Sequence, residues 1–303
     1  MKVTGLHLLL TYQCNYECDH CFVWGSPWQS GTMTLDLIDH ILQEARTLGT
    51  VTSIYFEGGE PFLFYPALCY GVRSAAAMGF DVGLVSNAYW ATSLRDAREW
   101  LSPLAGLLQD LSLSEDHYHG SGEEPLVANA RAAAVDLGIP VGTISVAQPE
   151  QDADAAVGQL PRAESAVMYR GRAADKLAPR ADKGSWRQFT TCPYEDLRDP
   201  GRVHVDPLGY VHICQGIALG NMLQRPLTEI VAGYKADAHP VSGPLLAGGP
   251  AELVQKYDVA HEKQYADACH LCYETRRALR ERFPQILAPD QMYGVVEEGP
   301  NGS

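Results

Sequence analysis

The sequence predicts an α/β protein: a partial (β/α)6 TIM-like barrel followed by a small cysteine-rich α+β extension. Three observations predict it. Short β-branched or apolar runs alternate with amphipathic stretches through the first half of the chain, an order typical of parallel βαβ units. That alternation stops near Gly171, and four of the eight cysteines follow it. We therefore expect the barrel over residues 1–175, and a connector with a second domain over residues 176–303.

Each element of the barrel follows from its own pattern. Apolar and β-branched runs predict strands over residues 4–10, 51–56, 80–85, 109–113, 139–147 and 165–169. Apolar residues at helical spacing predict helices over residues 34–48, 67–78, 93–101 and 126–137. Gly49, Gly79 and Gly138 follow three of these helices, where a left-handed C-terminal cap is expected. In such a barrel the reactive groups gather at the C-terminal ends of the strands.

The second half of the chain has a different organisation. Residues 203–205 and 210–213 flank Asp206-Pro207-Leu208-Gly209, which predicts a β-hairpin. Residues 226–250 are rich in proline, glycine and alanine, so we expect an irregular segment with weak helical pieces. Residues 266–283 contain the last predicted helix.

Composition and charge exclude several classes of partner. The 303 residues include 23 basic and 37 acidic side chains, a net charge of −14. Such a surface repels phosphate backbones and anionic lipid, so neither nucleic acid nor a membrane is expected as the main partner. No run of 18 apolar residues is present. The N-terminal pattern indicates a first strand and not a signal peptide, which predicts a cytoplasmic protein with reduced thiols.

Three cysteines form a tight loop directly after the first predicted strand. Cys14, Cys18 and Cys21 have the spacing C-x3-C-x2-C. Three thiolates can hold three irons of a [4Fe–4S] cube and leave the fourth iron open to an outside ligand. The same cysteines with His20 could instead form a structural zinc site with three sulfur ligands and one imidazole, or they could be plain buried thiols. The spacing alone leaves these alternatives open.

A glycine motif follows the second predicted strand. Gly58, Gly59, Glu60 and Pro61 come directly after Glu57. Paired glycines let the backbone approach a ligand closely, and the carboxylate that follows can take an ammonium group. An isolated string of this kind is a common turn. Here it lies one strand beyond the cysteine loop in the same predicted sheet.

Together, the cysteine loop and the glycine motif resemble the two main motifs of the radical S-adenosylmethionine (SAM) superfamily. The resemblance implies the same partial barrel. It implies that the three cysteines bind a [4Fe–4S] cluster, whose open iron SAM chelates through its amino and carboxylate groups. It also implies that the Gly-Gly-Glu-Pro stretch holds the SAM amino group and that His20 lies near the adenine.

Two weaker matches follow the third and fourth predicted strands. Ser86 and Asn87 resemble part of the family's Thr-Asn-Gly stretch, although Ala88 replaces the glycine. Ser114 begins a stretch that resembles the family's Ser-Leu-Asp, which often contacts the SAM ribose. The resemblance implies that all three contact the cofactor, and each is equally suited to cap the next helix.

A second set of cysteines lies in the extension: Cys192, Cys214, Cys269 and Cys272. Four thiolates complete one site with no open position, so a structural zinc site with four sulfur ligands is one interpretation. The layout also resembles the twitch or short SPASM extension of some radical SAM enzymes, which implies one auxiliary [4Fe–4S] cluster. Cys69 lies among apolar residues of a predicted helix and is expected in the core, not as a hydrogen-atom donor.

Three further residues are candidate catalytic groups. Asp116 and His117 lie beyond the fourth strand, at the expected mouth of the barrel, where they can bind substrate or move a proton. A solvated loop is an equal alternative. Arg172, past the sixth strand, can pair with a carboxylate such as that of SAM.

The resemblance implies a reaction. A cellular one-electron reductant of the flavodoxin or ferredoxin type reduces the cluster, SAM is cleaved, and a 5′-deoxyadenosyl radical takes a hydrogen atom from the substrate. We expect oxidation or epimerisation of a small molecule. Modification of a short ribosomal peptide is ranked lower, because the barrel begins by residue 4 and leaves no room for an N-terminal recognition domain. A metal-bound scaffold without catalysis is the third alternative.

Overall fold

One large sheet connects the two halves of the molecule. The structure is a computed structural model that describes residues 1–119, 125–151, 153 and 164–296. Over these residues the sheet contains β1 Val3–Thr11, β2 Ser53–Gly58, β3 Asp81–Ser86, β4 Asp110–Ser114, β5 Val141–Val146, β6 Glu164–Ser165, β8 Gly201–Val205, β9 Tyr210–Cys214 and β10 Ile217–Asn221. Their order is β10-β9-β8-β1-β2-β3-β4-β5-β6. β1 to β6 are parallel, which confirms the expected α/β class and the parallel sheet of a partial barrel.

The predicted barrel helices are present, each within two residues of its expected ends. The helices are α1 Leu35–Leu48, α2 Tyr65–Ala77, α3 Leu94–Leu101, α4 Leu126–Asp136, α5 Arg172–Lys176, α6 Leu227–Gly233, α7 Ser242–Tyr257 and α8 Ala268–Leu279. Thr34 and Ser93 cap α1 and α3 by accepting hydrogen bonds from main-chain N–H groups of their first turns. In the described part of the chain, none of these helices has the length and apolar character that a membrane crossing requires.

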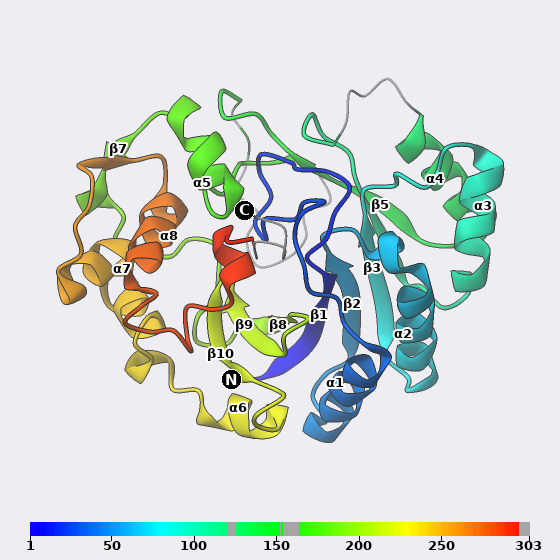
Figure 1. Cartoon of the computed structure of the whole chain (residues 1–303), viewed down its shortest axis with the longest axis horizontal. Helices are drawn as coiled ribbons and strands as arrows, with labels where there is room; N and C mark the ends of the chain where they lie inside the picture. Colours follow the sequence, from blue (N-terminus) through cyan, green and yellow to red (C-terminus); the bar gives the residue numbers. More distant parts are fainter. Residues whose placement is uncertain (120–124, 152, 154–163, 297–303) are drawn as a thin grey trace, which may run out of the picture.

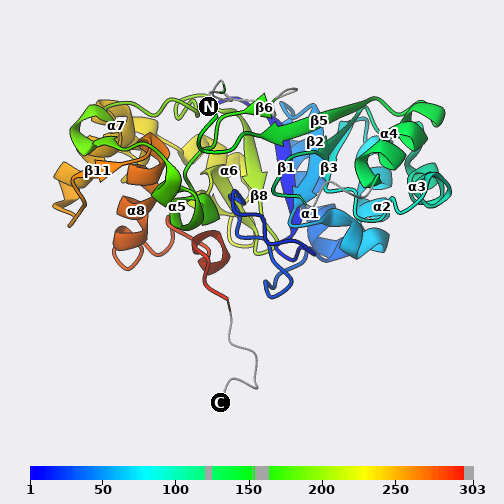
Figure 2. The same ribbon diagram turned by 90° about the horizontal axis from the view of Figure 1, so that it is seen from above.

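The strands of the barrel have two different faces. Leu6, Leu8 and Leu10 of β1 pack into the large apolar core with the barrel helices. His7 lies between them in sequence and lines an internal cavity. Because successive side chains of a strand point to opposite faces, the odd-numbered positions of β1 face the barrel interior. Figures 1 and 2 show α1 to α4 grouped on one side of the strands.

The extension continues the barrel sheet. β8 pairs in parallel with β1, on the side opposite β2. β9 returns antiparallel to β8, which confirms the predicted hairpin, and β10 follows antiparallel to β9. The strands after residue 200 therefore close one side of the barrel interior, while the division between residues 175 and 176 stays a prediction.

The remaining helices and a small sheet cover the extension. In Figure 1, α5, α7 and α8 lie on the left, across the strands from the barrel helices. α7 is kinked at Gly248 and Gly249, where the backbone leaves helical geometry. The short strands β7 Gly184–Ser185 and β11 Gln264–Tyr265 pair with each other nearby. The irregularity expected over residues 226–250 thus takes the form of two short helices and a kink.

The sixth barrel strand is shorter than predicted. A strand over residues 165–169 is wrong, since β6 ends at Ser165. Val167 and Tyr169 pack instead with Ala173 and Leu177 in a small separate cluster. Burial of these side chains against α5 takes the chain away from the sheet.

Candidate active site and cysteine centres

The three N-terminal cysteines lie on one loop at the C-terminal end of β1. The N–H of Cys21 donates to the carbonyl of Cys18 at 3.0 Å, which closes a tight turn. The thiol sulfurs accept main-chain hydrogen bonds: Tyr16 N–H lies 3.4 Å from Cys14 Sγ, and Gly25 N–H lies 3.1 Å from Cys21 Sγ. Such N–H groups stabilise the thiolate form that binds iron.

The electrostatics of these thiols fit a cationic metal cluster. Burial raises the pKa of Cys14 to about 12, against the opposing hydrogen bond from Tyr16. Burial also raises the pKa of Cys18, and the neighbouring Cys21 and Cys14 raise it further. Thiols this close and this buried ionise together only when a metal cation balances their charge. The donor set is therefore suited to a [4Fe–4S] cluster.

Arg172 holds the cysteine loop from behind. Its guanidinium is buried and donates to the carbonyl oxygens of Cys18 at 2.8 Å and Gly25 at 2.7 Å. Its main-chain N–H donates to the carbonyl of Cys21 at 2.9 Å. The Arg172 guanidinium therefore binds main-chain carbonyl groups of the cysteine loop. Its catalytic role stays a prediction.

The glycine motif packs directly against the cysteine loop. Gly59 N–H donates to the carbonyl of Thr11 at 2.7 Å, and Glu60 N–H donates to that of Gln13 at 2.9 Å. A Cβ atom at Gly59 would lie 2.0 Å from the Gln13 oxygen, so only glycine fits there. Pro61 starts the short 3-10 helix η1, Pro61–Phe64.

Glu60 connects this motif to the end of β3. Its carboxylate accepts from Phe62 N–H at 3.0 Å, from Ser86 Oγ at 2.9 Å and from Asn87 N–H at 2.8 Å. Burial raises the pKa of Glu60 to about 7, against these hydrogen bonds. Asn87 in turn donates its side-chain amide to Cys14 Sγ at 3.7 Å. Glu60 therefore positions Ser86 and Asn87 beside the first cysteine.

A cavity of about 240 Å³ brings most of the predicted cofactor residues together. From the sequence-predicted set, its lining includes Cys14, Cys18, Cys21, His20, Gly58, Gly59, Ser86, Asn87 and Ser114. Apart from the four later cysteines, the predicted residues that do not line it are Glu60, Pro61, Asp116, His117 and Arg172, all in the described part of the chain. These five residues contribute no surface to the cavity.

Asp116 lies behind His20, where its carboxylate faces two imidazoles. Asp116 Oδ2 is 3.3 Å from His20 Nε2, and Oδ1 is 2.7 Å from His119 Nδ1. Although burial opposes it, contact with both histidines lowers the pKa of Asp116 below its usual range. Tyr118 stacks on His20 with ring centroids 4.7 Å apart. His117 is exposed and does not line the cavity, whereas His119 does.

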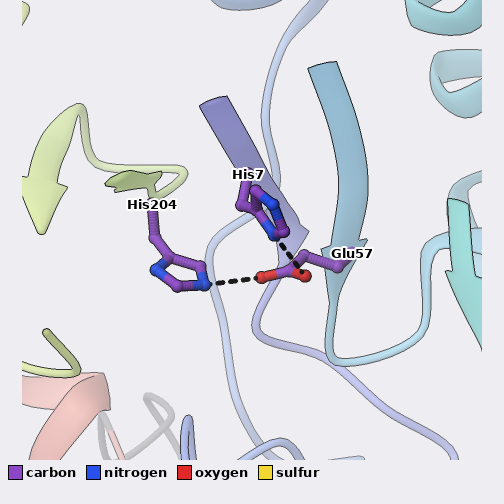
Figure 3. A group of neighbouring side chains, drawn as sticks. All are labelled: His7, Glu57 and His204. Atoms are coloured by element: carbon purple, nitrogen blue, oxygen red, sulfur yellow. Dashed lines mark hydrogen bonds and ion pairs between the residues drawn. The ribbon is translucent and has the colours of Figure 1, made fainter. Parts of the chain in front are cut away.

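Several polar residues of the cavity were missed by the sequence reasoning, and three of them form one group. His7 Nδ1 lies 3.1 Å from Glu57 Oε2, and His204 Nε2 lies 3.0 Å from Glu57 Oε1 (Figure 3). The two imidazoles lower the pKa of Glu57 well below its usual range although its burial opposes this, and burial lowers the pKa of His204 to about 4. The available signal was a polar residue inside each apolar strand pattern, at His7 and at His204.

The four later cysteines surround a second, smaller cavity, lined by Cys192, Cys214, Cys269 and Cys272. Burial raises the pKa of Cys192 to about 12, and the neighbouring Cys214 and Cys272 raise it further. Arg170 Nη1 donates to Cys214 Sγ at 3.1 Å and lies 3.3 Å from Glu195 Oε1. Four thiols around one small cavity, with a cation beside them, suit a metal centre with four sulfur ligands.

Arg170 lines both cavities and so lies between the two cysteine centres. Cys69, by contrast, is buried in the apolar core on α2. All eight cysteines are free thiols.

Comparison with known proteins identifies similarity to one protein family in the first third of the chain. Residues 8–114 match the family model described as the Radical SAM superfamily. The chain is similar to the putative peptide biosynthesis protein YydG of Bacillus subtilis (strain 168), with 31% identity over 111 residues, covering 36% of this chain and 35% of that protein. It is also similar to the tungsten-containing aldehyde ferredoxin oxidoreductase cofactor-modifying protein of Pyrococcus furiosus, with 36% identity over 107 residues, covering 35% of this chain and 28% of that protein.

A solved structure resembles the fold over a longer range. The crystal structure of BtrN in complex with AdoMet and 2-DOIA aligns with a TM-score of 0.51 and 15% identity, covering 75% of this chain and 81% of that one. At this identity the likeness concerns the fold alone. The aligned part of the chain spans about a third or less of the curated relatives' length.

Proposed function

Residues 8–114 form a radical SAM domain, and on that premise we propose that the whole chain is a radical SAM enzyme that abstracts a hydrogen atom from its substrate. One observation carries the proposal: three thiols and a backbone that tolerates only glycine meet at the wall of one cavity. When bound there, a [4Fe–4S] cluster and SAM supply an electron and a 5′-deoxyadenosyl radical.

The residues of the chain would bind the cluster, orient SAM and shield the radical from water. Cys14, Cys18 and Cys21 would hold the cluster, and Arg172 fixes the loop that carries them. Gly58 and Gly59 let their strand end pack against the start of that loop, and their backbone lines the cavity where the SAM amino acid group would bind. Enclosure of the cavity keeps water from the radical, while the cofactor performs the difficult step.

For the substrate we propose a small molecule that is oxidised or epimerised. The cavity is compact, and several polar side chains line it, among them Arg202, Glu195 and His204. A few placed polar groups in an otherwise apolar cavity are typical of small-molecule recognition. A short peptide is the second candidate, and the similarity to the putative peptide biosynthesis protein YydG favours it.

For the second cysteine centre we propose an auxiliary [4Fe–4S] cluster that exchanges an electron with the substrate. The position of Arg170 between the two cavities supports this role. Arg170 and Arg276 also place positive charge beside the four thiols. The two-cluster protein should hold about eight irons per chain. Four irons with one zinc would support the structural zinc alternative instead.

A one-electron donor of the flavodoxin or ferredoxin type completes the proposed partners. A cytoplasmic location agrees with eight free thiols. The scaffold alternative makes the opposite chemical prediction, namely that no SAM is cleaved.

The test is anaerobic reconstitution with iron and sulfide, followed by incubation with SAM and dithionite. We expect 5′-deoxyadenosine and methionine from the wild-type protein. Cys18→Ala should abolish both products, whereas Cys69→Ala should retain them, because Cys69 lies in the core away from the cavity. A wild-type protein that holds its irons but forms neither product would support the scaffold alternative and refute the proposal.

A further inference from the structure

The strand register brings three ligating side chains to one place inside the barrel. His7 of β1 pairs with His204 of β8, and Leu9 of β1 pairs with Glu57 of β2. Partners across a parallel pair share a face, and so do residues two apart on one strand. His7, Glu57 and His204 therefore all point into the interior from adjacent strands, as Figure 3 shows.

The three side chains converge closely. One ligand atom from each lies within 4.8 Å of the other two. Glu57 is only 6% exposed, yet its Oε1 has no hydrogen-bond partner, although His204 Nε2 lies 3.0 Å away. The two atoms are thus close without the alignment of a hydrogen bond. This arrangement is expected when both atoms face a common third partner.

We propose that His7, Glu57 and His204 bind a divalent transition-metal ion of the zinc(II) or iron(II) class. Two imidazoles and one carboxylate are a ligand set that both ions take in proteins, with at least one position left for a further ligand. The site is separate from both cysteine centres, and the binding of the ion does not depend on the proposed radical chemistry.

Neighbouring residues support the ligands. Tyr55 stacks on the His7 ring with centroids 4.7 Å apart and planes 10° from parallel. Gly83 on β3 makes room for Tyr55, since a Cβ there would lie 2.2 Å from the tyrosine ring. Arg202, a cation that lines the same cavity, pairs with Glu195 at 3.9 Å. Ligands on strands, oriented by packing, are held more precisely than ligands on loops.

A second cavity borders the site at the far end of the barrel. His7 and Arg202 also line a polar cavity of about 730 Å³ at the N-terminal ends of the strands, together with Thr4 and Asp110. His7 and Arg202 thus line the cavities on both sides of the site. His7, Glu57 and His204 also line the cavity of the proposed active site. A bound ion would there take a hydroxyl, carbonyl or carboxylate oxygen of the substrate as its further ligand.

The test measures zinc in the iron-loaded protein. Anaerobic holoenzyme is dialysed against Zn²⁺, and zinc and iron are counted by mass spectrometry. We expect one zinc per chain in addition to the iron. Glu57→Gln and His204→Ala should weaken zinc binding at least about tenfold with unchanged iron content. The matched controls, Glu281→Gln and His261→Ala, remove exposed side chains and should bind zinc like the wild type.

A second measurement needs no variant. Crystals of the wild-type protein soaked in Zn²⁺ should give an anomalous peak at the zinc edge between the three side chains. Absence of a peak there, or equal zinc affinity in the wild type and the two site variants, would overturn the proposal. Iron content and 5′-deoxyadenosine, read from the same samples, report separately on the proposed radical SAM function.

Discussion

The Arg172 side chain donates a hydrogen bond to the carbonyl oxygen of Cys18 at 2.8 Å, although the two residues are 154 positions apart. A residue of α5, which follows β6 in the chain, thereby holds the loop after the first strand. The conformation of the cysteine loop depends on this contact as well as on its own sequence.

We predict that Arg172→Ala loosens the cysteine loop. The change leaves the buried Gly25 carbonyl without its side-chain donor and removes one of two donors to the Cys18 carbonyl. It should lower the free energy of unfolding by about 1–3 kcal/mol and reduce the iron bound per chain. Thermal melts and iron analysis measure the two effects. Arg180→Ala is the control, because it removes an exposed ion pair with Glu150 and should leave the stability nearly unchanged. Equal losses in both variants would contradict this account.

Gly59→Ala should disrupt the contact between the glycine motif and the cysteine loop. The new Cβ would lie 2.0 Å from the Gln13 carbonyl oxygen, so one backbone must move. We expect a loss of stability of about 2 kcal/mol or more and weaker visible absorbance of the cluster after reconstitution. Gly142→Ala is the matched control, since a Cβ there meets no atom within 4 Å. Normal cluster absorbance in Gly59→Ala would refute the close-approach argument.

His239 should make stability depend on pH. Its Nδ1 accepts from Ser242 N–H at 3.0 Å at the start of α7, and burial lowers the pKa of His239 from 6.5 to about 4. The unfolded chain then binds a proton between pH 6.5 and 4 that the folded chain does not, so stability is lost as pH falls through that window. Relative to His239→Asn, the wild type should lose about 2 kcal/mol between about pH 7.5 and about pH 5.

Parallel denaturation of the two proteins at each pH checks this prediction. His261→Asn, at an exposed position, should follow the wild type at both pH values. A difference between wild type and His239→Asn that stays constant with pH would rule out His239 as the responsible group.

Arg170 should tune the proposed auxiliary cluster. Its guanidinium donates to Cys214 Sγ at 3.1 Å, and hydrogen bonds and positive charge at a ligating sulfur favour the reduced cluster. Arg170→Gln should therefore shift the reduction potential to more negative values, as followed by electron paramagnetic resonance during a redox titration. Arg187→Gln, at an exposed position, should leave the potential unchanged. A potential unaffected by Arg170→Gln would exclude this contact as a determinant.

Three kinds of feature could be predicted: the cysteine loop, the glycine motif and the four barrel helices. Each depends on the sequence of one short segment. Apolar spacing, caps such as Thr34 and Ser93, and the C-x3-C-x2-C spacing are local patterns with local physical causes. The same reasoning placed Ser86, Asn87 and Ser114 at strand ends, and these residues do line the cavity. The sixth strand was predicted too long. Val167 and Tyr169 pack on α5, and this packing outweighs their preference for a strand.

The sequence by itself determined the alternating α/β order and the residue types that bind a cluster. Only the tertiary structure decided that β8 lies next to β1, and with it the meeting of His7, Glu57 and His204. It also decided that Arg172 and Arg170 serve the two cysteine centres. These contacts join residues far apart in the chain, and their pairing is selected by the packing of the whole sheet, which leaves no periodic pattern in any single segment.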